Sequence, residues 1–351
     1  MAIQRDNDLA GLPAAPAREW VRRNIPEADV SGPWRPEVIA GGLSNITYRL
    51  PLPSGSLILR RPPLGPLLPR AHDVGREYRV LAALAPTDVP VPVPLGFCAD
   101  PDVIGAPFYL MPEVPGVVLR TRDDTGRLTV TRRSATASRL AETLAALHAV
   151  DPVSVGLGDY GRPGGYCQRQ LRTWGRQWER SRTRHLPDMN RLLEALAARA
   201  PQQDSGTSIV HGDYRIDNVI VDLGQTPQVA AVLDWELSTL GDPLADLGST
   251  MAYWHDLGDS KRYEIPVASG VTAWPGFPSA AEFAELYAKA SGRELGDLGF
   301  YLALGTMKLA VILEGVHARY LSGQASGPGY ATAGAAVPTL VARGLAQLSA
   351  S

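Results

Sequence analysis

Cysteine is scarce in this sequence of 351 residues, which contains only Cys98 and Cys167. Two cysteines are too few for a disulfide framework, and they lack the paired spacing of a zinc site. The scarcity therefore excludes the disulfide-stapled class of small secreted domain. It favours a reducing setting, and we expect the protein to be cytoplasmic.

Lysine is also rare, because the 34 basic residues include only Lys261, Lys289 and Lys308, all late in the chain. Any cationic side chain that binds phosphate in the first two hundred residues is therefore expected to be an arginine. The formal net charge is only −2. Such a charge gives the protein no strong overall field, so nucleic-acid binding through a basic surface is not expected.

Long apolar runs and an export signal are not expected either. Residues 1–16 mix Arg5, Asp6 and Asp8 with small residues and lack an uninterrupted apolar core, so they do not resemble a signal peptide. With 45% hydrophobic and 20% charged residues, the composition is ordinary for a globular protein. Neither disorder nor a membrane span is predicted, and the length allows two subdomains.

The most informative stretch of the chain reads HGDYRIDN at residues 211–218. Short apolar runs flank it on both sides, so we predict a loop between two strands that presents Asp213 and Asn218 from one turn. A further strand is predicted at 228–233, after a turn at 224–227, and it ends on Asp234. Two carboxylates and one amide are therefore expected to converge.

This set of groups suits phosphoryl transfer, which needs a carboxylate to orient the attacking hydroxyl and oxygen ligands for magnesium. Asp213 would be the base, and Asn218 and Asp234 would hold the metal. Arg215 would help to neutralise charge on the transferring group. The alternative is that the aspartates and the asparagine are only turn and helix-cap residues, because both types are common there.

Four nearby residues are expected to have supporting roles. His211 would brace the loop, Asp242 would cap a helix whose first turn holds a proline, and Asp246 would also support the loop. His148 ends a helix predicted at 135–150, and without a visible acidic partner it is expected to be a packed histidine without chemistry.

The motif at 211–218 and the later Asp234 resemble those of the protein-kinase-like superfamily. In that superfamily, His-x-Asp-x4-Asn supplies the base and one metal ligand, and a later aspartate also binds the metal. HGD at 211–213 matches its aminoglycoside phosphotransferase and choline kinase branch. Within the branch the chain most resembles the phosphotransferase domains related to those fused to acyl-CoA dehydrogenases. LRRPP at 59–63, Arg169-Gln170 with Trp174, and HGDYR at 211–215 carry that likeness.

The resemblance covers about 34–321 and implies an α+β, two-lobed protein-kinase-like fold, with a small β-rich N-lobe and a larger, mainly helical C-lobe. We expect an N-terminal arm at 1–33, the N-lobe at 34–114 and the C-lobe at 115–351. Residues implied to bind ATP or GTP are Gly41, Gly42, Ser44 and Asn45 in a hairpin tip, Arg60 in strand 57–61, Glu77 on helix 71–84, and Met111, Glu113 and Val114 at the hinge.

Two of these assignments have stated alternatives. Arg60 stands where the superfamily has a strand lysine, and Arg61 is the rival for contact with the phosphates. Glu77 resembles the helix glutamate that holds that cation, but an exposed helix glutamate would look the same in sequence. The glycine pair could likewise belong to a plain hairpin.

The sequence therefore predicts a small-molecule kinase that moves the γ-phosphoryl group of ATP or GTP, with Mg²⁺, to an acceptor hydroxyl. The basic helix at 166–184 and the lack of any acidic residue after Glu314 favour an anionic acceptor, such as a hydroxyacyl-CoA. The alternatives are an aminoglycoside phosphotransferase, which Asp256, Asp259 and Glu264 near a predicted lid keep open, and a catalytically silent nucleotide-binding scaffold. The sequence does not indicate an oligomeric state.

Overall fold

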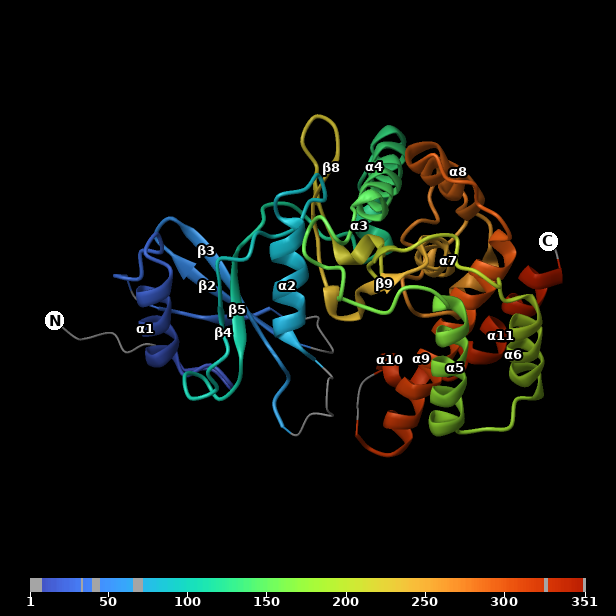
Figure 1. Ribbon diagram of the computed structural model, residues 1–351, viewed down its shortest axis with the longest axis horizontal. Helices are drawn as coiled ribbons and strands as arrows, with labels where there is room; N and C mark the ends of the chain where they lie inside the picture. The colour runs from blue at the N-terminus through green and yellow to red at the C-terminus, as the bar shows by residue number, and fades with distance from the viewer. Residues whose placement is uncertain (1–7, 33, 40–44, 66–71, 325–327, 350–351) are drawn as a thin grey trace. The chain divides into compact units, whose positions relative to one another are not determined.

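The computed structural model describes the whole chain except residues 1–7, 33, 40–44, 66–71, 325–327 and 350–351 (Figure 1). It divides into two compact units. Unit 1 contains Met1–Pro115 and Ala230–Glu236, and unit 2 contains Gly116–Val229 and Leu237–Ser351. Unit 1 is small and built on a sheet, whereas unit 2 is larger and mainly helical, as the sequence predicted.

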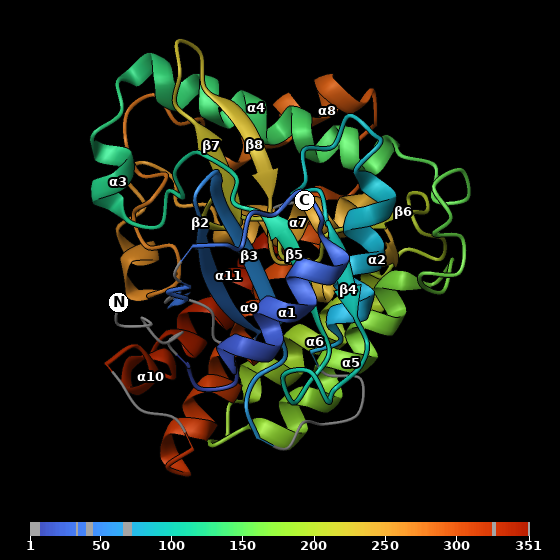
Figure 2. The ribbon, with the colours of Figure 1, turned by 90° about the vertical axis from the view of Figure 1, so that its left-hand side faces the viewer.

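Unit 1 contains a five-stranded antiparallel sheet with strand order β1-β2-β3-β5-β4 (Figure 2). Residues on adjacent positions of a strand face opposite sides of a sheet. In the register, Leu59 lies between Tyr48 and Leu110, and the next residue, Arg60, lies opposite Tyr109. The strands are β1 (Glu37–Val38), β2 (Ile46–Leu52), β3 (Gly55–Arg61), β4 (Gly96–Cys98) and β5 (Phe108–Pro112).

Among the described residues of unit 1, two helices cover opposite faces of this sheet. Helix α1 (Ala14–Asn24) buries Ala14, Ala17 and Val21 in the cluster that contains Tyr48 and Leu59. Residues 14–24, which were expected within an N-terminal arm, therefore form a helix that packs into the core of unit 1. Helix α2 (Val74–Leu84) instead brings its buried side chains to the Arg60 face.

Helix α2 begins three residues later than the sequence predicted. The side chain of Asp73 accepts a hydrogen bond from the Arg76 backbone N–H, so Asp73 is the N-cap and the helix starts at Val74. Its buried residues recur at three- and four-residue spacing, which places them on one side of the helix. They are Val74, Glu77, Val80, Leu81 and Leu84.

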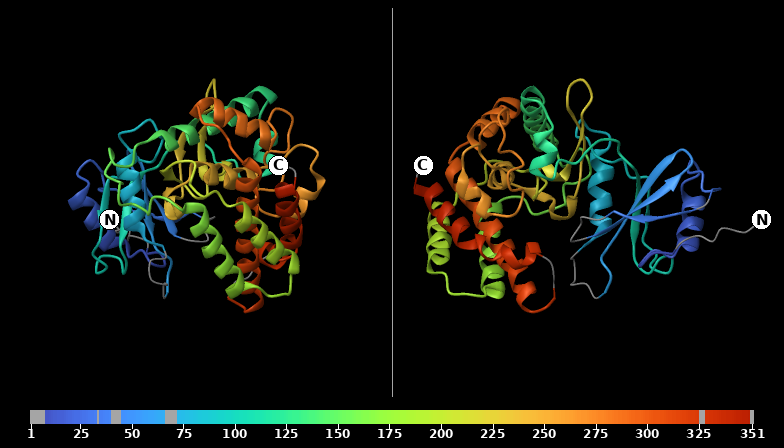
Figure 3. Two further views of the ribbon diagram at one scale, coloured as in Figure 1. Left: turned by 45° about the vertical axis from the view of Figure 1, so that its right-hand side comes forward. Right: turned by 180° about the vertical axis from the view of Figure 1, so that it is seen from behind.

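Unit 2 is organised around the long helix α9, which packs against five other helices of the unit (Figures 1 and 3). Helices α7 and α9 cross so closely that a Cβ atom on Gly305 would lie 2.5 Å from the Gly248 carbonyl oxygen. The helices are α3 (Arg122–Gly126), α4 (Val130–Ala149), α5 (Tyr166–Ser181), α6 (Pro187–Arg199), α7 (Pro243–Tyr253), α8 (Ala280–Ser291), α9 (Leu298–Leu321), α10 (Pro328–Ala333) and α11 (Ala336–Ser349).

Helix α9 is the one helix in the described ranges that is long and apolar enough to cross a membrane, judged by length and composition alone. However, 78% of its most apolar window is buried inside the structure. Packing against neighbouring helices therefore accounts for its apolar sequence.

Short strands flank the HGDYRIDN segment, as predicted. Strand β6 (Ser208–Val210) enters it and β7 (Val219–Asp222) leaves it, with a 3-10 turn at Ile216–Asn218. Strand β8 (Gln228–Val232) pairs with β7, and β9 (Thr239–Gly241), which the sequence did not predict, pairs with β6. Asp242 then caps α7 by accepting a hydrogen bond from the Leu244 N–H at 2.9 Å, also as predicted.

Candidate active site

The centre of the site in unit 1 is the carboxylate of Glu77, which is only 1% exposed. It accepts hydrogen bonds from the Asn45 amide at 2.9 Å, from Arg60 Nε and Nη2 at 2.8 and 3.1 Å, and from the Tyr109 hydroxyl at 3.1 Å. A buried carboxylate needs such partners to offset its lost hydration. Glu77 is therefore not the exposed helix glutamate of the alternative interpretation.

The guanidinium of Arg60 joins Glu77 to a second carboxylate. Its Nη2 atom donates to Asp234 Oδ1 at 2.6 Å, and its side chain is 14% exposed. Burial lowers the pKa of Arg60, but the charges of Glu77, Tyr109 and Asp234 outweigh that effect and raise the pKa above its usual value. Unit 1 thus holds a permanently charged cation with a fixed orientation.

Asp234 has an unusual backbone conformation, with φ at 65°. Within the described ranges, His72 and Ala268 are the other non-glycine residues with positive φ. Such a conformation costs free energy and persists only where the surroundings impose it, which occurs often at functional sites. This conformation is an observation independent of the sequence motif, and it supports the prediction that Asp234 is a functional residue.

Arg61 lies on the opposite face of β3 and is 4% exposed. Its guanidinium donates to the backbone carbonyls of Pro62, at 3.1 Å, and Ile104, at 3.2 Å, and also to that of Gly11. These contacts tie the N-terminal segment to the sheet. Arg61 therefore has a structural position, and the phosphate-binding role of Arg60 stays a prediction.

The predicted hairpin tip is only partly described, because Gly41, Gly42 and Ser44 lie outside the described residues. Asn45, the first residue after them, is 2% exposed. Its amide nitrogen is used by Glu77. In this structure Asn45 orients the glutamate that orients Arg60, and contact with a nucleotide stays a prediction.

The predicted hinge continues from β5. Met111 is 7% exposed and pairs with Ile58 in the sheet. Glu113 is paired through its carboxylate with Arg49, at 2.8 and 2.9 Å. Val114 is half-buried and lies beyond the end of the β5 ladder. Contact of these three residues with a nucleotide base stays a prediction.

The site in unit 2 is the HGDYRIDN loop, which gathers two predicted residues, Asn218 and Arg215, around the carboxylate of Asp213. Asn218 Nδ2 donates to Asp213 Oδ2 at 3.0 Å and to the Asp213 carbonyl at 2.9 Å. Arg215 Nε lies 3.3 Å from Asp213 Oδ2, and Arg215 Nη2 lies 3.3 Å from Asp217. Asp213 keeps 18% of its side chain exposed, so it remains accessible to a small molecule.

Tyr253 on α7 completes this part of the site and was not identified from the sequence. The guanidinium of Arg215 lies 4.7 Å from the centre of its ring, a cation–π contact. Burial raises the pKa of Tyr253, and the charge of Asp213 raises it further. A cavity of about 10 Å³, room for about one water molecule, is lined by Arg215, Tyr253, Trp254 and Thr272 among others.

Asp246 on α7 holds the backbone of the HGDYRIDN loop. Its carboxylate accepts the His211 N–H at 2.7 Å and the Gly212 N–H at 2.9 Å. It also lies 3.2 Å from His148 Nε2, whose other ring nitrogen lies 2.7 Å from the Tyr287 hydroxyl. His148 is 2% exposed, so the prediction of a packed histidine is confirmed. Its acidic partner was not visible in the sequence, because helix packing brings Asp246 to it from 98 residues away.

His211 braces the loop from inside, as predicted. It is fully buried, and its Nδ1 atom accepts the Asp213 N–H at 3.2 Å. Gly212 between them has φ at 81°, and a Cβ atom there would lie 2.7 Å from the Leu237 carbonyl oxygen. Both facts require glycine at this position.

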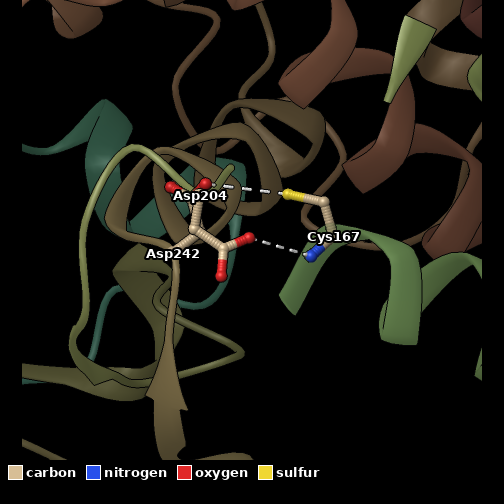
Figure 4. Close-up of side chains that lie close together, drawn as sticks. All are labelled: Cys167, Asp204 and Asp242. Carbon is tan, nitrogen blue, oxygen red and sulfur yellow. Dashed lines mark hydrogen bonds between the residues drawn. The ribbon is translucent and has the colours of Figure 1, made fainter. Parts of the chain in front are cut away.

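Cys167, Asp204 and Asp242 form a second polar cluster in unit 2 (Figure 4). Their ligand atoms are close enough to hold a metal ion, but the carboxylates already accept hydrogen bonds. Asp204 binds the Cys167 N–H, and Asp242 binds the Ser205 N–H, the Tyr301 hydroxyl and the Cys167 thiol. Burial raises the pKa of Cys167, which disfavours the thiolate that metals require. We interpret the cluster as a structural junction.

The arginines on and just after α5 fall into two groups, those that bind other groups of the protein and those that are exposed to solvent. Arg169 donates to the carbonyls of Gly164 and Arg162, and Arg184, just beyond the helix, lies 3.1 Å from the buried Glu314. These two are engaged within the protein. Three others on the helix are exposed to solvent, namely Arg172, Arg176 and Arg180.

The residues expected to hold magnesium fit a hard cation that prefers oxygen ligands. The amide nitrogen of Asn218 is used by Asp213, which leaves its amide oxygen for a metal. Around Asp234, the carboxylates of Glu77 and Glu236 lie within 4.8 Å, and Glu236 is an additional candidate that the adjacent DWE motif could have indicated. Asp234 belongs to unit 1 and Asn218 to unit 2, so their convergence stays a prediction.

The chain matches a known protein family and several curated sequences. A family model described as the phosphotransferase enzyme family matches residues 36–290. Acyl-CoA dehydrogenase family member 11 of Gallus gallus is 42% identical over 296 residues, which cover 82% of this chain and 37% of that protein. Family member 10 of Mus musculus is 40% identical over 292 residues, 81% of this chain and 26% of that protein. The match thus spans less than two fifths of either relative.

Solved structures of phosphotransferases are also similar to this chain. One from Ralstonia eutropha JMP134, described provisionally as an aminoglycoside phosphotransferase, has a TM-score of 0.81 and 36% identity, covering 95% of this chain and 98% of that one. An aminoglycoside phosphotransferase in complex with GDP and kanamycin has a TM-score of 0.60 and 15% identity, covering 95% and 97%, which shows the fold alone. The chain therefore belongs to the phosphotransferase enzyme family and has its protein-kinase-like fold.

Proposed function

We propose that this protein is a small-molecule kinase that transfers the γ-phosphoryl group of ATP or GTP to an acceptor hydroxyl. The observation that carries the proposal is the arrangement around Asp213. One carboxylate oxygen receives the Asn218 amide at 3.0 Å and lies 3.3 Å from Arg215 Nε. A fixed, partly exposed carboxylate beside a cation and an oxygen ligand suits phosphoryl transfer.

In the proposed reaction, Asp213 orients the acceptor hydroxyl and accepts its proton as the oxygen attacks the γ-phosphorus. Arg215 offsets the negative charge on the transferring group. Asn218 and Asp234 are the proposed magnesium ligands, and the metal would neutralise charge on the phosphates. The chain's own contribution is mainly the fixed geometry of these side chains.

Arg60 is the proposed contact for the nucleotide phosphates. Glu77 holds its guanidinium through Nε and Nη2, so the side chain is oriented before a ligand arrives. Solved relatives of the same fold include complexes with AMP-PNP and with GDP. This range of nucleotides supports ATP or GTP as donor without choosing between them.

We propose an anionic acceptor, with a hydroxyacyl-CoA as the leading candidate. The curated relatives are acyl-CoA dehydrogenase family members, which is consistent with a substrate that carries CoA. The exposed arginines Arg172, Arg176 and Arg180 supply positive charge on α5. Arginine binds phosphate and carboxylate groups through two parallel hydrogen bonds.

An aminoglycoside is the alternative acceptor, and the structure from Ralstonia eutropha favours it through its provisional description. A polycation would need acidic residues that are not already engaged. Asp256 accepts the Ala280 N–H at 2.7 Å, Asp259 pairs with Arg343 at 2.5 Å, and Glu264 accepts the Thr339 hydroxyl at 2.7 Å. These engagements make the three residues weaker candidates for binding a polycation.

The test is a kinase assay with Mg-ATP and Mg-GTP against a 4-hydroxyacyl-CoA, choline and kanamycin at matched concentrations. The readout is nucleotide turnover together with the mass of the phosphorylated product. We expect turnover with the acyl-CoA. Phosphorylation of kanamycin alone would establish the aminoglycoside alternative. Nucleotide binding without turnover on any acceptor would favour the silent scaffold.

A further inference from the structure

Lys308 on α9 is a buried lysine to which the mechanism above gives no role. It is 8% exposed, whereas Lys261 and Lys289 are exposed. Its ammonium donates to the backbone carbonyl of Gly212 in the catalytic loop. A buried ammonium whose hydrogen-bond acceptor is a carbonyl loses much of its hydration without an ion-pair partner in direct contact. If this position served only to fill the apolar core, an uncharged side chain would suffice.

The contact lies at the peptide bond that leads into the proposed base. The Gly212 carbonyl belongs to the peptide that joins Gly212 to Asp213, so a hydrogen bond to it restrains the rotation of that peptide. On the N–H side of the turn, Asp246 accepts the His211 and Gly212 amides at 2.7 and 2.9 Å. A carboxylate from α7 and an ammonium from α9 therefore hold the two polar sides of the same turn.

The surroundings keep the ammonium directed to this position. Lys308 Nζ lies 5.8 Å from the ring centre of Trp174 on α5, within the range of a cation–π contact. Burial lowers the pKa of Lys308, the charges of Asp213 and Asp246 oppose that shift, and the charge of Arg215 adds to it. Burial has the largest effect, so the pKa of Lys308 lies below the usual lysine value, and Asp213 and Asp246 are the neighbours that favour its charged form.

We propose that Lys308 is a positioning residue for phosphoryl transfer, which fixes the Gly212–Asp213 peptide and thereby the direction of the Asp213 carboxylate. This inference rests on the proposed function, because it gives Lys308 its effect through the base. It differs from a purely structural role in one measurable respect. The effect of removing the ammonium must depend on whether Asp213 is present.

The test compares the wild type with Lys308→Met, which keeps the length of the side chain but removes its charge. Lys289→Met, the same change on an exposed surface of α8, is the matched control. With Mg-ATP and the acceptor that the wild type uses, we expect Lys308→Met to lower kcat by about 10- to 100-fold, as for a misplaced catalytic group. The Kd for ATP should stay within about twofold, because Arg60 and Glu77 are unchanged.

A double-mutant cycle with Asp213→Ala separates positioning from stability. In the Asp213→Ala background, Lys308→Met should change the residual kcat by less than about twofold. An equal loss in both backgrounds, or a folded Lys308→Met protein with wild-type kcat, would overturn the proposal.

Circular dichroism and thermal unfolding check the fold of each variant. If Lys308→Met does not fold, Lys308→Arg replaces it, because it retains a cation beside Asp246 while moving the donor. Failure of both variants to fold would overturn the proposal by assigning the residue to the fold itself. If the wild type has no turnover on any acceptor, the proposed function fails, whereas an active wild type with an equally active Lys308→Met rejects only this inference.

Discussion

Arg60 and Asp234 are separated by 174 positions in the sequence, yet the guanidinium of one and the carboxylate of the other meet at 2.6 Å within unit 1. The same guanidinium is held by Glu77. One arginine therefore connects a strand, a helix and the segment after β8. The proposed phosphate contact and one proposed magnesium ligand are thus neighbours before any nucleotide binds.

The exchange of Asp213 for alanine tests the proposed base. Asp213→Ala should lower kcat by roughly 10²- to 10⁴-fold, because the hydroxyl loses both its orientation and its proton acceptor. Nucleotide affinity should hardly change, because the proposed nucleotide contacts lie in unit 1. Steady-state kinetics and nucleotide titration measure the two effects, and undiminished turnover would remove Asp213 from the mechanism.

The adjacent arginines Arg60 and Arg61 form a matched pair of alanine variants. Arg60→Ala should raise the KM for nucleotide, because it removes the cation that Glu77 orients. Arg61→Ala should leave that KM nearly unchanged but lower stability by about 1–3 kcal/mol, because buried carbonyls lose their donor. Kinetics and denaturant unfolding give both numbers. The opposite ranking of KM values would transfer the phosphate contact to Arg61.

The role of Asp234 in metal binding predicts a dependence on magnesium. Asp234→Asn should weaken nucleotide binding in the presence of Mg²⁺, because a charged ligand is lost to a cation that prefers carboxylate oxygen. Without Mg²⁺ the variant and the wild type should bind nucleotide more nearly alike. Calorimetric titration with and without the metal measures this. An equal loss of affinity under both conditions would argue against metal ligation.

The buried Asp246 predicts a specific dependence of stability on pH. Burial raises its pKa, but hydrogen bonding and charge from His148 and His211 outweigh burial and lower the pKa below 3.8. A carboxylate whose pKa falls on folding stabilises the protein above its unfolded-state pKa. That contribution is lost as the pH falls from 3.8 through the lower folded-state value.

Asp246→Asn should therefore have a lower free energy of unfolding than the wild type near neutral pH, and the difference should narrow below pH 3.8. Urea unfolding followed by tryptophan fluorescence across this range measures it. Asp102→Asn, at an exposed position, is the control and should show little difference. A gap that widens on acidification would contradict the assignment.

Much of the loop around Asp213 could be predicted because its contacts are local. Asn218 reaches Asp213 across five residues, and the flanking apolar runs place both on a turn between strands. The small sheet and the larger helical unit followed from the family resemblance. The capping of α7 by Asp242 followed from Asp-Pro at a helix start.

The contacts that were missed depend on packing between elements that are distant in the sequence. Asp246 meets His148 across 98 residues, and Lys308 meets Gly212 across 96. Helical periodicity predicts which side of a helix is buried, but not which residue of another element it will meet. Tyr109 was missed for the same reason, because only the strand register places it opposite Arg60.

The close crossing of α7 and α9 has a consequence for tolerance to substitution. Gly248 and Gly305 allow the two backbones to approach, and the Cβ of an alanine at Gly305 would lie 2.5 Å from the Gly248 carbonyl oxygen. The same pair of helices carries Asp246, which binds the backbone amides of the turn before Asp213, and Lys308, which binds a carbonyl of that turn. A single methyl group at this crossing would therefore push α7 and α9 apart, separate the contacts of Asp246 and Lys308 with the turn, and loosen the proposed base, Asp213, that follows it.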